Sequence, residues 1–321
     1  MIRVCEPLVG ELEKKYLCQA IDEGEISSGG KFVRRFEEAF AKWSGNKYAV
    51  AVCNGTAALE VASRALTMTT ISVPSGTIIS CYVAPMRAGA SINLHDNVTA
   101  VKSHIMRVHL FGARDFSLGD HVVDDLSQYW KPFVVGQVGS YSLYANKLIT
   151  AGEGGVVVTN DAEIFERAKS YRNLCHSKER FVHEEIGYNF RMSNLQGAVA
   201  LAQLEQIDKF SEIKQANQKL YFHHLPQEVE PVCAEIPWMH LIRTNKDAGE
   251  VVAEMEKRGI ECRRFFYPLH RQPCLPRVSG SFPMAEKFWN QTFYLPSGLN
   301  LTEKDIIDVC RALRETLRSL K

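Results

Sequence analysis

The chain carries almost no net charge and has no long apolar run. Its 321 residues include 38 lysines and arginines against 37 aspartates and glutamates. No basic stripe interleaved with aromatic residues occurs, so nucleic acid is not an expected partner. No apolar stretch is long enough to cross a bilayer, and the first residues lack the pattern of a secretory signal. These absences predict a protein without a membrane partner.

Several metal and nucleotide motifs are also missing. The nine cysteines are scattered and none forms a C-x-x-C pair, so no metal site is expected. Their odd, dispersed distribution favours reduced thiols in a cytoplasmic protein. No G-x-G-x-x-G follows the first predicted strand, and no G-x-x-x-x-G-K-[ST] occurs. Nicotinamide-dependent oxidoreductases and P-loop enzymes are therefore disfavoured.

The length of the chain favours two domains. Up to about residue 160, apolar strand-like segments alternate with helix-like segments, which predicts a largely parallel sheet. Asn54 is placed to cap the helix that follows the strand at 48–54. A capping box at Ser193 and Gln196 predicts one long helix that continues to about residue 222.

A second, smaller unit is predicted after Pro226, which ends the long helix. Its expected elements are strands at 238–245 and 260–268 and helices at 248–259, 283–292 and 303–319. The sequence therefore predicts an α/β protein with a large, mainly parallel-sheet domain over 1–222. A smaller C-terminal α+β domain is expected over 223–321.

One lysine occupies an unusual place between two apolar strands. Lys147 lies between the run that ends at Tyr144 and the valines at 156–158, and three glycines follow it within eight residues. A desolvated ammonium is costly unless it is paired or its charge is removed. A Schiff base with an aldehyde removes the charge, so Lys147 is a candidate for covalent attachment of an aldehyde cofactor.

Polar residues stand at helix starts and strand ends, where α/β sheets bind ligands. Gly55 and Thr56 begin a helix whose free N–H groups favour an anion such as phosphate. Ser142, five residues before the lysine, can offer a hydroxyl to the same phosphate. Two adjacent carboxylates, Asp124 and Asp125, end a buried strand, where one of them can pair with a ring nitrogen.

Two further groups complete the set: Gln128 shortly after the carboxylates, and Asn189 with Arg191 just before the long helix. Taken singly, these features are better explained as ordinary helix caps, solvated loop acids or surface ion pairs. Together they match the needs of pyridoxal 5'-phosphate (PLP). This cofactor requires an amine for its aldehyde, a carboxylate for its pyridinium nitrogen and donors for its phosphate.

These residues lie in motifs that resemble the DegT/StrS family of PLP-dependent nucleotide-sugar aminotransferases. The most specific are "NKLITAGEGG" and "GYNFRM", and "AVCNGTAALE", "RRFFYPLHRQPC" and "YLPSGLNLT" occur in the family's order. The resemblance covers nearly the whole chain and implies the aspartate aminotransferase fold, fold type I. The segments "YANKLITAGEGG" and "FFYPLH" are most similar to the perosamine synthase branch.

The resemblance implies roles for the matching residues. Lys147 forms the covalent link to PLP and moves the proton at the substrate carbon. Asp125 pairs with the pyridine nitrogen, and Gln128 contacts the ring hydroxyl. The phosphate is held by Gly55, Thr56 and Ser142.

The implied reaction is transamination of a nucleotide-linked keto sugar. In the perosamine synthase branch, the 4-keto group of a 6-deoxyhexose is aminated with L-glutamate as donor, which gives an amino sugar nucleotide. The family's pattern also implies that Asn189 reaches the phosphate of the cofactor in the partner subunit. The expected assembly is therefore a homodimer with shared active sites.

The sequence departs from the family at three places. Ile78 stands where the family has an aromatic residue against the cofactor ring, so plain apolar contact replaces stacking. The segment 113–120 is too short for the helix that normally lies there, and the span from Asp125 to Lys147 is also shortened. We expect a compact member of the family with an altered sugar-nucleotide pocket.

Some residues and functions stay open. Arg263 and Arg264 suit a diphosphate or the donor's carboxylate, and equally a strand surface. Four others receive no role: His109, His183, His270 and Arg191. One alternative function is a PLP-dependent sugar dehydrase or eliminase, which the presence of Lys147 disfavours because some dehydrase relatives carry histidine there. The other is a non-catalytic PLP-binding regulatory protein.

Overall fold

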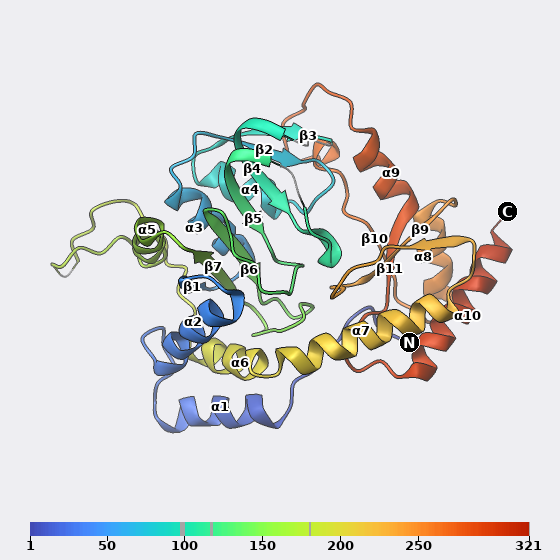
Figure 1. Ribbon diagram of the computed structural model, residues 1–321, viewed down its shortest axis with the longest axis horizontal. Coiled ribbons are helices and arrows are strands. Elements are labelled where there is room, and N and C mark those ends of the chain that lie inside the picture. The colour runs from blue at the N-terminus through green and yellow to red at the C-terminus, as the bar shows by residue number, and fades with distance from the viewer. Residues whose placement is uncertain (97–99, 116–117, 180, 321) are drawn as a thin grey trace.

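The computed structural model describes residues 1–96, 100–115, 118–179 and 181–320. It contains a seven-stranded sheet near the N-terminal part of the chain and a four-stranded sheet near the C-terminal part. Figure 1 shows helices packed against both, with α6 and α7 running from beside the larger sheet to the smaller one.

The larger sheet is mostly parallel, as the sequence predicts. Its strand order is β1-β7-β6-β5-β4-β2-β3, and β7 runs antiparallel to both of its neighbours, whereas the other neighbouring pairs are parallel. The carboxyl ends of β1, β2, β5 and β6 therefore meet at one edge of the sheet. The strands are β1 (Tyr48–Val52), β2 (Thr70–Pro74), β3 (Ser91–His95), β4 (Ala100–Val108), β5 (Leu118–Asp125), β6 (Val138–Ser142) and β7 (Gly155–Thr159).

Helices cover both faces of this sheet because its buried strands alternate their side chains between the two faces. Val50 and Val52 of β1 pack with one group of helices, and Ala49 and Ala51 pack on the opposite side. The first group is α3 (Gly55–Ala65), α4 (Ser80–Arg87) and α5 (Ala162–Arg172). The second is α2 (Lys31–Ser44) and α6 (Asn194–Leu204), with α1 (Glu11–Asp22) lying against α6.

The single long helix predicted from residue 193 is two helices. α6 begins at the predicted capping box, in which the backbone N–H of Gln196 donates to Ser193 Oγ at 3.2 Å. α7 (Ile207–His224) starts after a break at Glu205 and Gln206, and it ends before Pro226. The Gln206 side chain donates to the carbonyl of Ala202 at 3.0 Å, which satisfies a carbonyl in the last turn of α6. Neither glycine nor proline marks this break in the sequence.

The smaller sheet has the order β10-β11-β9-β8 and is antiparallel throughout. Its strands are β8 (Val229–Pro231), β9 (His240–Thr244), β10 (Arg263–Arg264) and β11 (Thr292–Leu295). Its helices are α8 (Ala248–Lys257), α9 (Pro283–Gln291) and α10 (Glu303–Ser319), and short 3₁₀ turns lie at Leu110–Gly112 and Leu269–Arg271.

One expectation for this unit needs correction, and two strands are added. The strand predicted at 260–268 is only the two-residue β10, because the chain soon reaches Pro268 and the 3₁₀ turn after it. The strands β8 and β11 are additions that the sequence pattern did not reveal. The division into domains 1–222 and 223–321 stays a prediction, and its boundary falls inside α7.

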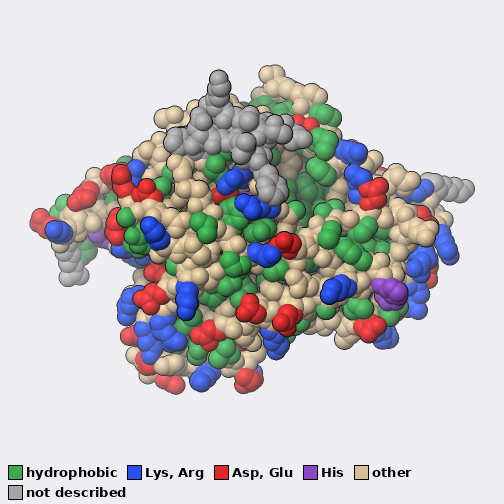
Figure 2. Space-filling model, in the orientation of Figure 1, with side chains coloured by type: hydrophobic (Ala, Val, Ile, Leu, Met, Phe, Trp, Pro, Cys, Tyr) green, Lys and Arg blue, Asp and Glu red, His purple; other side chains and the backbone are tan. Residues whose placement is uncertain are grey.

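The distribution of charged side chains and the state of the cysteines agree with what the composition predicts. Figure 2 shows acidic and basic side chains interspersed over the visible face. All nine cysteines are free thiols. Within the described part of the chain, no helix is both long and apolar enough to cross a membrane, and no group of three or more metal-ligating side chains is found.

Gly155, the first residue of β7, provides a test of this packing. A Cβ atom at this position would lie 2.4 Å from the carbonyl oxygen of Asn54. Gly155→Ala should therefore lower the free energy of unfolding by about 2 kcal/mol or more, because backbone must move. At the control position Gly136 an added Cβ meets nothing within 4 Å, so Gly136→Ala should change stability by less than about 0.5 kcal/mol. Equal urea midpoints for the two variants would contradict the expectation.

Candidate active site

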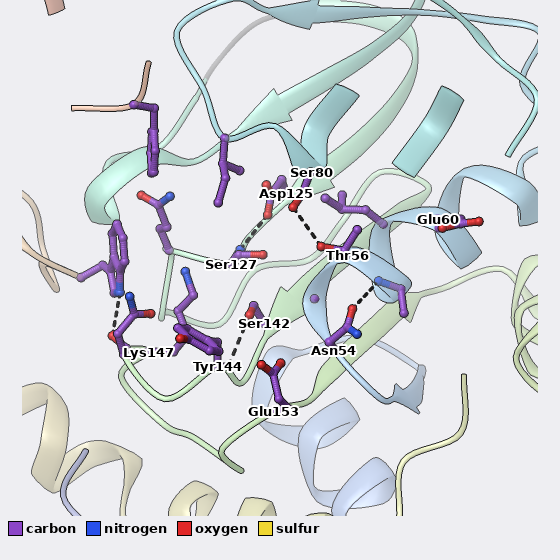
Figure 3. A pocket seen from close by; sticks show the side chains of 18 of the residues that line it. Asn54, Thr56, Glu60, Ser80, Asp125, Ser127, Ser142, Tyr144, Lys147 and Glu153 are labelled. Atoms are coloured by element: carbon purple, nitrogen blue, oxygen red, sulfur yellow. Dashed lines mark hydrogen bonds between the residues drawn. The ribbon is translucent and has the colours of Figure 1, made fainter. Parts of the chain in front are cut away.

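A cavity of about 590 Å³ lies where the strands of the larger sheet end. Figure 3 shows Thr56, Asp125, Ser142 and Lys147 arranged around it, each carried by a different segment. Of the predicted cofactor-binding residues, those that line the cavity are Gly55, Thr56, Asp125, Gln128, Ser142 and Lys147. The fold therefore brings together residues that the chain separates by up to 92 positions.

The start of α3 forms one wall of the cavity. Asn54 caps the helix as predicted, since its Oδ1 accepts the N–H of Ala57 at 2.8 Å. A Cβ on Gly55 would lie 2.6 Å from that of Ser142, so glycine lets β6 pack directly against the first helical turn. Thr56 Oγ1 lies 2.9 Å from Ser80 Oγ, which the sequence reasoning did not select. Hydroxyls thus surround the free N–H groups of a helix start, which suits an anion such as phosphate.

The two adjacent carboxylates have different surroundings because alternation along β5 separates them. Asp124 is fully buried and accepts two hydrogen bonds from the guanidinium of Arg107, at 2.8 and 2.9 Å. Asp125 lines the cavity and accepts hydrogen bonds from Cys81 Sγ at 3.1 Å and from the backbone N–H of Ser127 at 3.0 Å. Asp124 therefore serves a structural ion pair, and Asp125 is the carboxylate that a ligand can reach.

Gln128 is nearly buried and stands beside Asp125 in the cavity wall. The backbone N–H of Phe111 donates to its Oε1 at 2.8 Å. The side-chain carbonyl is therefore occupied, and the amide N–H groups are the part of Gln128 that can serve a ligand.

Lys147 lies on the loop between β6 and β7, and local hydrogen bonds fix this loop. The backbone N–H of Lys147 donates to the carbonyl of Tyr144 at 2.9 Å. Thr150 Oγ1 and the N–H of Ala151 both donate to the carbonyl of Leu143 at 3.0 Å. The loop thus presents the lysine at the edge of the sheet beside the other cavity residues.

The side chain of Lys147 is half-buried in the cavity wall. Burial lowers its pKa to about 8, although Asp125 and the thiols of Cys81 and Cys5 act in the opposite direction. Its Nζ lies 4.2 Å from the ring centroid of Trp238. At pH 7 about a tenth of such amines are neutral, compared with about one in 3,000 for an ordinary lysine. Lys147 is therefore a far better nucleophile than a surface lysine.

Elements of the smaller sheet close the cavity, and sequence reasoning found only one of their residues. Trp238, Phe266 and Tyr294 line it together with Arg263, whose Nη2 lies 2.7 Å from Glu261 Oε1. No local pattern marks these three aromatic residues as site residues, since each packs like an ordinary core side chain. Ile78 also lines the cavity at 37% exposure, so an aliphatic side chain occupies this wall.

Other residues considered from the sequence lie in structural contacts. The guanidinium of Arg264 lies over the ring of Trp289, with 3.9 Å from Cζ to the ring centroid. Two histidines contact side chains: His109 Nε2 lies 3.0 Å from Asp124 Oδ1, and His270 Nδ1 lies 2.8 Å from Ser75 Oγ. His183 Nδ1 lies 2.8 Å from the carbonyl oxygen of Leu174, and Arg191 Nη1 donates to Asn173 Oδ1 at 2.7 Å. Asn189 is exposed and is not among the residues that line this cavity. A contact with a partner subunit remains a prediction for it.

Fold and site together define an α/β protein in which a lysine with a lowered pKa lies in a cavity at the edge of a mostly parallel sheet. A model of the DegT/DnrJ/EryC1/StrS aminotransferase family matches residues 7–97 and 134–314. The chain belongs to this family, and it is therefore an enzyme of the PLP-dependent aminotransferase class.

Individual relatives agree with this assignment over almost the whole chain. It is 30% identical to GDP-perosamine synthase of Escherichia coli O157:H7 and 30% identical to GDP-perosamine synthase of Vibrio cholerae, with 98% of each chain covered in both comparisons. Its fold matches that of Helicobacter pylori PseC, an aminotransferase of pseudoaminic acid biosynthesis, with a TM-score of 0.91, 20% identity and coverage of 99% and 100%. The predicted fold class is confirmed.

The unmatched stretch 98–133 contains the shortened segment 113–120 and the first part of the shortened span from Asp125 to Lys147. The alignment with the Escherichia coli enzyme extends over 358 positions, more than the 321 residues of this chain. Within the segment 113–120, residues 116 and 117 lie outside the described residues, and β5 already begins at Leu118. Asp125 and Gln128 fall inside the unmatched stretch, so the fold rather than the family model places them in the cavity.

The ionisation of Lys147 can be measured directly. Competitive acetylation of the purified chain freed of any cofactor, followed across pH by mass spectrometry of the Lys147 peptide, should give half-maximal reactivity near pH 8, because only the neutral amine reacts. Reactivity should fall below this pH and level off above it. Added Nα-acetyl-lysine amide serves as the standard and should titrate near about 10.4. A Lys147 profile that coincides with this standard would show that the amine is not desolvated.

Proposed function

We propose that this chain binds PLP through Lys147 and transfers an amino group from L-glutamate to the keto group of a nucleotide-linked sugar. The product is an amino sugar nucleotide. The observation that carries the proposal is the convergence of a desolvated amine, a buried carboxylate and a hydroxyl-lined helix start on one cavity. These are the three groups that PLP requires.

The residues present fit the cofactor. Lys147 supplies the amine for its aldehyde, Asp125 the carboxylate for its ring nitrogen and Gln128 the amide N–H groups for its ring hydroxyl. The start of α3, with Thr56 and Ser142, supplies donors for its phosphate. When bound, PLP supplies an electron-withdrawing ring that stabilises negative charge on the carbon next to the transferred nitrogen.

The protein's own groups hold and move protons around that carbon. With the cofactor bound, the neutral amine of Lys147 would accept a proton from the amino-bearing carbon of the donor and would give one up to the carbon of the sugar that receives the amino group. Its lowered pKa suits this role, because the amine can exist in both forms near neutral pH. Asp125 would hold the ring nitrogen of the bound cofactor, and Trp238 and Tyr294 line the same cavity from the side of the C-terminal part of the chain.

The names of several relatives support a sugar nucleotide as the substrate. Besides the GDP-perosamine synthases, a relative from Streptomyces venezuelae that is 28% identical is a dTDP-3-amino-3,4,6-trideoxy-alpha-D-glucose transaminase. We infer a 4-keto-6-deoxyhexose as the sugar. Arg263 at the cavity is the candidate for pairing with the diphosphate or with the donor's carboxylate.

Transamination should be detected by mass spectrometry of the products. The chain with PLP, L-glutamate and a GDP- or dTDP-linked 4-keto-6-deoxyhexose should give a sugar nucleotide with an amine in place of the ketone oxygen, together with 2-oxoglutarate. Lys147→Ala should give at least about a thousandfold less product, because the proton-transferring amine is gone. Borohydride reduction should fix cofactor on the Lys147 peptide of the wild type only.

Two results would count against this function. A product that has lost a hydroxyl without gaining nitrogen would indicate the eliminase alternative. Cofactor fixed on the same peptide in Lys147→Ala would show that another residue forms the covalent link. Catalytic turnover with glutamate, in contrast, would exclude the hypothesis that the chain is a non-catalytic PLP-binding protein.

We also propose that the enzyme is a homodimer in which Asn189 serves the partner's cofactor site. The segment after α5 projects from the body of the molecule in Figure 1. It carries exposed apolar side chains, with Phe181 73% and Ile186 87% exposed, and Asn189 follows directly. Such side chains on a projecting segment favour burial against another subunit.

Mixing two inactive variants tests the shared site. Lys147→Ala and Asn189→Ala subunits, co-refolded in equal amounts, should regain about a quarter of wild-type activity, because half of the dimers are mixed and each mixed dimer has one complete site. Each variant refolded alone is the control. If Asn189 acts within its own chain, no mixed dimer contains a complete site and activity does not return.

A further inference from the structure

Trp238 occupies a defined place between the two sheets. Its indole Nε1 donates to the carbonyl of Asn146, the residue before Lys147, at 2.8 Å. Its own carbonyl accepts a hydrogen bond from the buried Lys214 Nζ at 2.7 Å. The ring packs against Phe111 and Tyr294, with centroid distances of 5.3 and 5.9 Å, and the residue is 3% exposed. Its orientation is thus fixed from both sides.

The fixed indole presents its face to the amine of Lys147. Nζ lies 4.2 Å from the ring centroid, well within the range of a cation–π interaction. No described oxygen is within hydrogen-bonding distance of Nζ, and both oxygens of Asp125 already accept hydrogen bonds from Cys81 and Ser127. The indole of Trp238 thus makes a defined contact with this amine.

We propose that Trp238 is a positioning residue whose indole face holds the amine of Lys147 inside the cavity whenever that amine is not covalently linked. The inference rests on the proposed function, because it concerns the intervals in which Lys147 acts as a proton carrier. A long, flexible lysine side chain that is free in this cavity has many rotamers available to it. The indole restricts them and keeps the amine near the reacting carbon.

The contact should alter the ionisation of Lys147 in a specific direction. An indole face stabilises the ammonium form. The other groups that act on this amine are Asp125 of β5, Cys81 of α4 and Cys5 of the N-terminal segment. Weakening the indole contact alone should therefore increase the acid dissociation constant of Lys147 while these three groups stay in place.

Fluorinated tryptophan weakens the contact with little change in size. Competitive acetylation of the full chain across pH, without cofactor or substrate, should show that the acid dissociation constant of Lys147 rises about threefold to tenfold from tryptophan to polyfluorinated tryptophan. The chain has four tryptophans, so the same series is run in Trp238→Phe, in which the fluorine effect on Lys147 must vanish. Trp289→Phe, which removes the ring beneath Arg264, is the matched control and should retain it.

Two outcomes would overturn the proposal: a Lys147 profile unaffected by fluorination, or an equal fluorine effect in Trp238→Phe. In steady-state assays, Trp238→Phe should lower kcat at least about threefold with little change in KM, because it affects proton transfer rather than substrate binding. A lower kcat without the fluorine effect would indicate a merely structural role and would also refute the proposal.

Failure of the proposed function gives a different result. If reduction fixes PLP on another lysine, Lys147 is not the cofactor lysine, yet the fluorine effect on its acetylation still reports the indole contact. If PLP is fixed on Lys147 and the fluorine effect is absent, the proposed function stands and only the role of Trp238 is wrong.

Discussion

The site depends on keeping one amine out of water without an ordinary ion pair. Burial is the main cause that lowers the pKa of Lys147 to about 8, against the opposing effect of Asp125 and two thiols. An ammonium ion so placed would be unstable if nothing compensated it. The compensation comes from the indole face of Trp238, two residues before β9, and from a carboxylate at the end of β5. Because these two groups come from different parts of the chain, the ionisation of the lysine depends on how those parts pack together.

Close backbone approach makes the opposite wall of the cavity. β6 and β7 lie against the first turn of α3 because glycine occupies both contact positions, Gly55 and Gly155. Side chains there would separate the helix start from Ser142. The hydroxyls and the free N–H groups then could not serve the same phosphate. The glycines therefore contribute to binding although they carry no functional group themselves.

Much of the larger sheet follows from local sequence signals. Short apolar runs predict its strands, and the helix after β1 has its cap at Asn54 as expected. The break between α6 and α7 has no such signal, because side chains such as Gln206 stabilise it through tertiary contacts. Propensity alone therefore predicts one continuous helix where packing produces two.

In the candidate site, too, the sequence predicts some residues, whereas others are identified only by their contacts in the fold. Lys147 is conspicuous in the sequence because an ammonium between two buried strands requires an explanation. The choice between Asp124 and Asp125 cannot be made from adjacent letters alone, since it depends on which face each carboxylate meets and on Arg107 from β4. Trp238 lies 91 positions after the lysine and has no local signature, so only the three-dimensional contact identifies it.

The first residues of the chain are hydrogen-bonded to segments from its last quarter. The N–H of Ile2 donates to the carbonyl of Gly259 at 2.8 Å, and the N–H of Ser297 donates to the carbonyl of Val4 at 2.7 Å. During synthesis on the ribosome, this N-terminal segment emerges long before either partner exists. These hydrogen bonds of the N-terminal segment can form only after nearly the whole polypeptide has been made. The docking of this segment is therefore a late folding event that joins residues far apart in the sequence.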